Sequence, residues 1–361
     1  MRRTIPPPKQ VEAIRRSCHE HVTAGATKPS FGINPWLAIA LCFAACKSHT
    51  PSDSDDHVDP IAGEDDSCDP ATPKVCRGDD VIECGSNGHL GRRLRACHDG
   101  CKDGRCELTC SDDGVKLIYL VDDQNDFLSF DPRKLPDNPF HLIGKLQCAD
   151  RGSPFSMSVD RHGMAWVVYD DGELFKVSID DAHCSPTSFS PGQAGSITFG
   201  MGFATDTPGG KTEKLYLAAN DFSHVLSALD PSSAAIARRG VLSATDEGNP
   251  ELTGTSDAKL YGFYPVELSA PFVQEIDRAT GGPIGPRWPI GPGSIGTIAA
   301  YAFAQWGGTF YVFATVRDEE FNENSTVRTV DRSGHYKTIM QQLPYRITGA
   351  GVSTCAPERD Q

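Results

Sequence analysis

Cysteine is the residue type whose spacing in this sequence carries the clearest chemistry. Seven of the thirteen cysteines fall within residues 68–110, in the spacing C-x7-C-x7-C-x12-C-x3-C-x4-C-x3-C. They are Cys68, Cys76, Cys84, Cys97, Cys101, Cys106 and Cys110. A segment this short buries little apolar surface, so cross-links must supply much of its stability. We therefore expect a disulfide-rich module at 68–110, with zinc, which favours two paired C-x2–4-C knuckles, as the alternative.

Part of this segment resembles a short cysteine-rich repeat found in many exported bacterial proteins. The pattern C-x-G-x-x-V-x-x-C, followed by C-x-x-G-C-x-x-G-x-C, runs from Cys76 to Cys106. The module 68–110 makes up about an eighth of the chain, and the resemblance implies no enzymatic role. The pairing stays open, because six cysteines allow fifteen connectivities.

The N-terminal segment has the features of an export signal. Residues 1–30 are basic, and the ten residues Trp36–Ala45 form an unbroken apolar run, too short for a stable membrane span. The run ends in small residues directly before Cys46, which resembles the lipobox of bacterial lipoprotein signal peptides. That resemblance implies a signal peptide at 1–45 and a lipid on Cys46 that holds the chain at a membrane. An ordinary secretory signal is the alternative.

Removal of the predicted signal peptide on export would change the net charge and the number of cysteines. The 361 residues carry a net charge of −14, and removing residues 1–45, with six basic and two acidic side chains, makes it −18. Residues 46–67 are polar and acidic, which predicts a disordered tether. Acidity argues against nucleic-acid binding, and no apolar run could span a bilayer. Beyond Cys46, ten cysteines remain, an even number suited to disulfides in an oxidising compartment.

Signatures of catalysis are missing from the sequence. It contains no G-x-S-x-G, H-E-x-x-H or phosphate-binding loop. Four carboxylates, Glu251, Asp160, Asp206 and Asp257, lie near the ends of predicted strands but form no convincing metal set, so we assign no catalytic, metal or cofactor residue. The histidines His162 and His224 fall in predicted turns and are expected to be exposed; no D-x-[DN]-x-[DN]-G calcium loop is present.

Residues 111–355 would position any functional side chains, and their pattern predicts an all-β domain. Short apolar runs alternate with Gly, Asp, Asn and Pro, without a 3.6-residue period. The clearest unit, Phe155 to Asp181, predicts strands at 164–169 and 173–179 around tight turns. Related units end at aspartates spaced 47–54 residues apart, which we interpret as turn formers: Asp131, Asp180, Asp230, Asp277 and Asp331.

Four strands per unit of about 50 residues are typical of a propeller blade. Five units fit residues 111–361, so we expect a five-bladed β-propeller, with six blades as the alternative. The first unit lacks its opening strand, and residues 346–354 form an unpaired one, which predicts ring closure by the C-terminus. A Cys110–Cys355 disulfide would lock this closure, leaving Cys148 and Cys184 to pair with each other.

The unit resembles bacterial propellers of the NHL, lactonase and YncE-like types. The resemblance rests on Asp160, Gly163 and Trp166, then Asp171-Gly172, Leu174 and Asp180. It implies a fold that hosts enzymes, carriers and scaffolds alike, so the fold cannot choose among them. Lactonase-type members, by this resemblance, hold a divalent metal between Glu, Asn and Asp side chains of the channel strands.

The predicted turns between second and third strands share one strongly acidic face. It could bind Ca²⁺ or a basic partner, or be a solvated rim of turns. The residues are Asp122, Asp123, Asp126, Asp170, Asp171, Asn220, Asp221, His224, Glu267, Arg317, Asp318, Glu319 and Glu320.

These observations favour a lipid-anchored protein of the bacterial cell envelope, periplasmic or at the surface. Its propeller would be non-catalytic and would bind a protein, glycan or small ligand. A metal-dependent propeller hydrolase or lactonase-like enzyme is the alternative, and recognition by the cysteine module is a third. We expect a monomer, with the membrane as a partner through the lipid, no cofactor and no nucleic acid.

Overall fold

Strands dominate the computed structural model, which describes residues 66–149, 152–242 and 248–359. Its helices are two 3-10 turns, Gly114–Lys116 and Pro132–Lys134, so the all-β class is confirmed for this part of the chain. The predicted signal peptide 1–45, Cys46 and nearly all of the predicted tether 46–67 lie outside the described residues. Among the described residues, no helix is long and apolar enough to cross a membrane.

The cysteine-rich segment folds around a small antiparallel sheet. Strands β1 (Lys74–Arg77), β2 (Asp80–Cys84) and β3 (Leu90–Ala96) pair in that order, followed by a hairpin of β4 (Cys101–Lys102) and β5 (Arg105–Cys106). Three disulfides join Cys68 to Cys84, Cys76 to Cys101 and Cys97 to Cys106. Val81 and Ile82 are buried on β2, while β3 is mostly exposed. With so little apolar burial, the disulfides supply much of the stability here.

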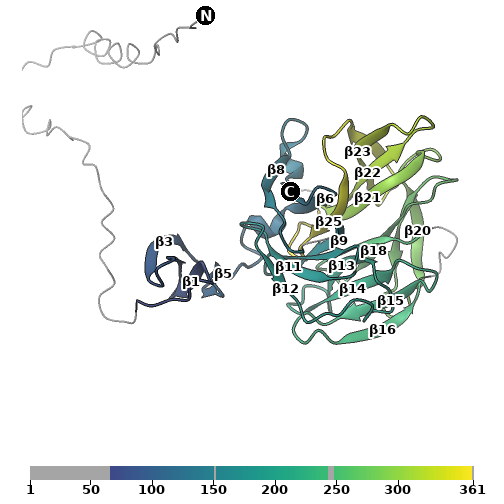
Figure 1. Ribbon diagram of the computed structural model, residues 1–361. Helices are drawn as coiled ribbons and strands as arrows, with labels where there is room; N and C mark the ends of the chain where they lie inside the picture. The colour runs from purple at the N-terminus through teal and green to yellow at the C-terminus, as the bar shows by residue number, and fades with distance from the viewer. Residues whose placement is uncertain (1–65, 150–151, 243–247, 360–361) are drawn as a thin grey trace, which may run out of the picture. The chain divides into compact units, whose positions relative to one another are not determined.

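Five four-stranded antiparallel sheets make up the rest of the described structure (Figure 1). Consecutive strands are neighbours within each sheet, except that the C-terminal strand β25 joins the sheet of β6, β7 and β8. The first strands of the five sheets are β25 (Ile347–Val352), β9 (Pro154–Val159), β13 (Phe199–Thr205), β17 (Glu251–Gly254) and β21 (Thr297–Trp306). The second strands are β6 (Ile118–Asp122), β10 (Met164–Tyr169), β14 (Glu213–Ala219), β18 (Leu260–Tyr264) and β22 (Thr309–Arg317).

The third and fourth strands complete each sheet and differ sharply in burial. The third strands are β7 (Asp126–Phe130), β11 (Leu174–Ser178), β15 (Val225–Leu229), β19 (Phe272–Ile276) and β23 (Glu323–Asp331). The fourth strands are β8 (Phe140–Lys145), β12 (Cys184–Pro186), β16 (Ile236–Val241), β20 (Pro283–Pro289) and β24 (Tyr336–Met340). The second strand β10 is buried on both faces and reads as a continuous apolar run, whereas most residues of fourth strands such as β16 and β20 are partly or fully exposed.

The first strands of neighbouring sheets lie against one another. Strand β9 packs beside β13, β13 beside β17, β17 beside β21, and β25 beside both β21 and β9. Glycine makes this approach possible: a methyl group on Gly254 would come within 2.2 Å of the Phe203 carbonyl oxygen, and one on Gly200 within 2.2 Å of that of Pro250. Because Gly200 faces Pro250 and Phe203 faces Gly254, these two strands run parallel.

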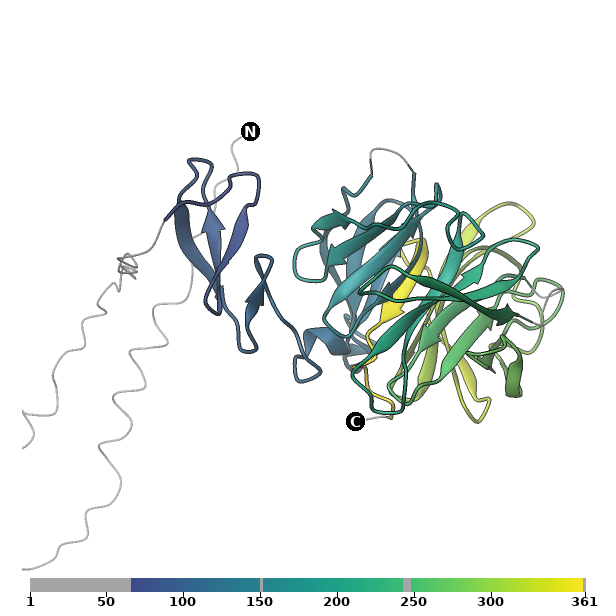
Figure 2. The same ribbon diagram turned by 90° about the horizontal axis from the view of Figure 1, so that it is seen from below.

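The C-terminal strand joins the sheet at the start of the domain. Strand β25 pairs antiparallel with β6, so that Val352 lies opposite Ile118 (Figure 1). Figure 2 shows this yellow strand beside the blue strands that follow the cysteine-rich segment. Two disulfides, both predicted from the sequence, join Cys110 to Cys355 beyond the end of β25 and Cys148 to Cys184 at the start of β12.

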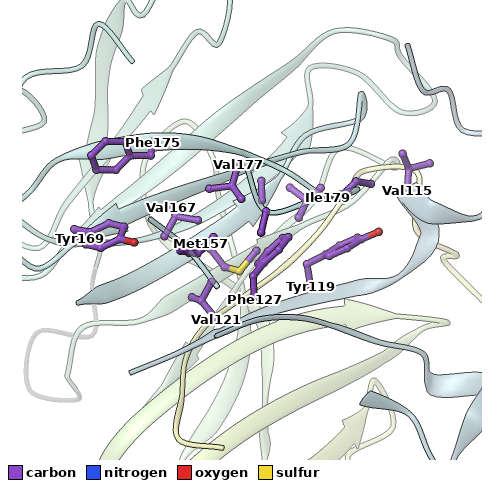
Figure 3. Close-up of a cluster of buried hydrophobic side chains, with 14 of the residues drawn as sticks. Val115, Tyr119, Val121, Phe127, Met157, Val167, Tyr169, Phe175, Val177 and Ile179 are labelled. Carbon is purple, nitrogen blue, oxygen red and sulfur yellow. The ribbon is translucent and has the colours of Figure 1, made fainter. Parts of the chain in front are cut away.

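The apolar core fills the spaces between adjacent sheets. Between the β25–β8 sheet and the β9–β12 sheet, side chains such as Phe127, Met157, Val167 and Val177 are fully buried (Figure 3). Each such side chain stabilises the fold by about 1.5–3 kcal/mol relative to exposure. The core thus fixes neighbouring sheets face to face.

Candidate functional site

The region between the first strands is polar, but its polar groups bond to one another. The Phe203 amide donates to Ser158 Oγ at 3.0 Å, and the Gln305 amide donates to Thr253 Oγ1 at 3.1 Å. All four residues are buried. These bonds join β13 to β9 and β21 to β17, so buried hydroxyl groups are used to hold neighbouring first strands together.

Glu251 is the most deeply buried carboxyl group of this region. It is 2% exposed, and Ser156 Oγ donates to its Oε2 at 2.8 Å across from β9. Burial raises the pKa of Glu251 well above its usual value, against the lowering effect of bonds from Ser156 and the Met201 amide. Glu251 therefore links three neighbouring first strands, β9, β13 and β17, through its hydrogen bonds.

Two further buried carboxyl groups, those of Glu213 and Asp160, lie near the residues that follow the first strands. Glu213 accepts from the Arg161 amide at 2.8 Å and from Thr354 Oγ1 at 2.6 Å, which connects β14 to the residues after β9 and β25. Burial, assisted by the charge of Asp160, raises the pKa of Glu213 to about 7. Asp160 is itself buried and accepts from Trp166 Nε1 at 3.1 Å. Glu213 therefore links three neighbouring sheets, whereas Asp160 bonds within its own sheet.

The four carboxylates weighed as metal ligands do not assemble into one site. Asp206 lies 3.8 Å from Lys214 Nζ, and Asp257 accepts a hydrogen bond from Thr255 Oγ1. Glu251 and Asp160 are each occupied by the neighbours described above. In the described part of the chain, no group of three or more His, Cys, Asp or Glu side chains could hold a metal ion.

In each sheet, the turn between the second and third strands lies on the same side of the molecule as the segment that leads into the first strand. We call this side the turn face. The turns between first and second strands, and between third and fourth strands, form the opposite face. Many acids of the turn face build the turns themselves: Asp122 Oδ1 accepts from the Gln124 and Asp126 amides at 2.9 and 2.8 Å, and Asp221 accepts from the Ser223 amide at 2.8 Å. Asp122 and Asp221 thus shape turns, which is one of the roles considered for the acidic residues from the sequence.

The two histidines differ in burial. His162 is exposed, whereas His224 is only 8% exposed, so the prediction of an exposed His224 is wrong. His224 directly precedes β15, and the amide of Leu242, which follows β16, donates to its carbonyl oxygen at 2.8 Å.

On the opposite face, the repeated aspartates form turns as expected. Asp131, Asp230, Asp277 and Asp331 each accept from a backbone amide two residues further on. In the second unit this bond is made by Asp181, which accepts from the His183 amide at 3.3 Å, rather than by Asp180.

The turn face also contains a hollow of about 440 Å³ beside Arg346. The Arg346 guanidinium lies 3.7 Å from Asp123 and 3.8 Å from Glu323, and it donates to the Ala299 carbonyl at 2.9 Å. The lining combines carboxylate, amide, hydroxyl, guanidinium and phenol groups: Glu323, Asn324, Ser325, Gln342, Leu343, Pro344, Tyr345 and Arg346. From the sequence, Arg346 was expected only as part of the closing strand. Its contacts with Asp123, Glu323 and Ala299 were not predicted, because these residues are distant in the chain.

A second hollow, of about 350 Å³, lies elsewhere on the turn face. Its lining residues precede β13 or follow β14: Gly192, Gly195, Ser196, Ile197, Thr198, Asn220 and Asp221. The turn face therefore has at least two places where a ligand could contact polar groups.

Comparison with known proteins gives only distant similarity. No protein-family model and no curated protein sequence matches the chain. A nidogen/laminin complex is similar in structure at 13% identity, with a TM-score of 0.39, over 77% of this chain and 96% of that chain. An endo-arabinase from Bacteroides thetaiotaomicron has 8% identity and a TM-score of 0.38, over 55% of this chain and 84% of that chain. A calcium-binding protein, regucalcin, from Agrobacterium tumefaciens has 12% identity and a TM-score of 0.33, over 55% and 77%.

The chain is thus an all-β protein built from repeated four-stranded sheets and cross-linked by disulfides. Five disulfides indicate an exported protein in an oxidising environment.

Proposed function

We propose that this chain is a lipid-anchored protein of the bacterial cell envelope that binds a ligand, without catalysis, on the turn face of a closed five-bladed β-propeller. The succession of first strands, with β25 packed beside both β21 and β9, supports the closed ring. The five disulfides support export, and the small-residue sequence before Cys46 supports lipid attachment.

The distribution of polar groups carries the proposal for binding on the turn face. Between the first strands, polar side chains such as Ser158, Thr253 and Glu251 are buried and bonded to the neighbouring strand. On the turn face, by contrast, side chains of varied chemistry surround the hollow beside Arg346. A ligand can reach the second set of groups without breaking bonds that hold the ring together.

Photo-crosslinking in living cells tests binding at this face. A diazirine amino acid is placed at exposed positions Asp171 or Glu267 on the turn face and, as matched controls, at Ala279 or Ser333 on the opposite face. We expect adducts from the first two positions only. Equal adducts from both faces, or none from the turn face, would contradict the proposal.

Metabolic labelling tests the location separately. Wild-type chain grown with labelled palmitate should carry label and sediment with membranes, and the Cys46→Ser variant should do neither. An unlabelled wild-type chain would refute lipid attachment but leave the role of the turn face open.

A further inference from the structure

The turn face carries three large apolar residues that are mostly or fully exposed to solvent. Phe222, Leu268 and Phe321 are 102%, 98% and 77% exposed. The exposed apolar residues of the fourth strands, such as Leu142, Ile284 and Tyr336, reach only 42–52%. Isolated exposed apolar residues are ordinary, but these three occupy the same structural position in successive sheets.

Each apolar tip lies in the turn between the second and third strands of its sheet. The three turns follow β14, β18 and β22, and each contains an acidic residue, a large apolar residue and then Ser or Asn. The three sequences are Asp221-Phe222-Ser223, Glu267-Leu268-Ser269 and Glu320-Phe321-Asn322. Because neighbouring sheets are arranged alike, the three tips lie on one side of the molecule.

Hydrogen bonds hold these turns in shape. Asp221 accepts from the Ser223 amide at 2.8 Å, and Ser294 Oγ donates to the Glu267 carbonyl. In the third turn, Asp318 accepts from the Asn322 amide at 2.8 Å and from its side-chain amide at 3.0 Å. The tips therefore sit on turns that lose little freedom when a partner binds.

The backbone of Phe321 is held in an unfavourable conformation. Its φ of 65° lies in the left-handed region, which costs little for Gly or Asn and more for an aromatic residue. The corresponding turns of the first two sheets place Asn125 and Gly172 in that region. A phenylalanine at such a position is a poor choice for turn stability and points to a role for its ring.

We infer that the three tips form a docking surface for a protein partner that has apolar pockets surrounded by basic side chains. The turns at 220–224, 265–271 and 318–322 carry five acidic residues and no Lys or Arg, so a basic surface complements them. The same acidity disfavours insertion into an anionic membrane. This inference rests on the proposed function and names the partner class for the turn face.

Peptide display tests the docking surface with a defined probe. The full chain carrying Cys46→Ser is used to select from a random 12-residue library, and selected peptides are synthesised for fluorescence anisotropy. We expect peptides that combine Lys or Arg with aromatic or aliphatic residues. Their Kd should rise at least about tenfold in the variant Phe222→Ser/Leu268→Ser/Phe321→Asn, since truncating a central anchor typically costs that much. A matched variant, Leu142→Ser/Ile284→Ser/Tyr336→Ser, should bind like the parent.

Three outcomes would overturn the inference: no selected peptide depends on the tips, the selected peptides lack basic residues, or the parent binds phosphatidylcholine vesicles through the tips. Thermal melts check folding, and Phe321→Asn alone should not lower Tm, because Asn suits the left-handed conformation. Crosslinks from the turn face that persist in the triple tip variant would refute the docking surface while leaving the proposed function intact.

Discussion

Buried carboxyl groups connect the first strands at the scale of single residues. Glu251 bonds to Ser156 near one end of these strands, and Glu213 bonds to Arg161 and Thr354 near the other. Burial raises the pKa of both acids. Both groups bond to neighbouring strands, so we assign them to holding the fold together.

The raised pKa of Glu213 predicts a pH-dependent stability. Its native pKa of about 7 exceeds the ordinary value of 4.5, so the native state holds more protons between these pH values. Its contribution is therefore most favourable below pH 4.5 and is lost as pH rises through 7. In urea denaturation, wild-type stability relative to Glu213→Gln should fall by about 3 kcal/mol across this range. A constant difference between the two proteins would show that Glu213 does not titrate this way.

At the scale of strands, glycine sets how closely the first strands approach. A Cβ atom at Gly254 would meet the Phe203 carbonyl oxygen at 2.2 Å, and backbone atoms cannot move aside cheaply. We predict that Gly254→Ala destabilises the protein by about 2 kcal/mol, as overpacking does. Gly293→Ala is the control, since nothing lies within 4 Å of its Cβ position. Chemical denaturation should separate the two, and equal stabilities would contradict the close packing.

The positions of strands could be predicted from the sequence where both faces of the strand are buried. The apolar run Met164–Tyr169 matched β10 residue for residue, and the predicted closing strand at 346–354 contains β25. Fourth strands such as β16 gave weak signals because they are half exposed. The proximity of Arg346 to Asp123 and Glu323 could not be predicted, since it depends on how sheets distant in sequence pack.

At the scale of the whole molecule, two disulfides close chain segments of very different length. Cys110–Cys355 joins residues 245 apart, and Cys148–Cys184 joins residues 36 apart. Loop-closure entropy then predicts that replacing the first pair by Ser costs about 5 kcal/mol, some 1–2 kcal/mol more than replacing the second. Denaturation of the two double variants checks this order, and a larger loss from the shorter loop would contradict it.

Hydrogen exchange on the Cys46→Ser chain, with and without isolated cell envelopes, tests most directly whether the turn face is the binding face. We predict slower exchange with envelopes in residues 120–126, 219–225 and 317–323, and unchanged exchange in the opposite-face turns at 230–235 and 277–282. Protection confined to the opposite-face turns, or to the cysteine-rich segment 68–110, would contradict the account.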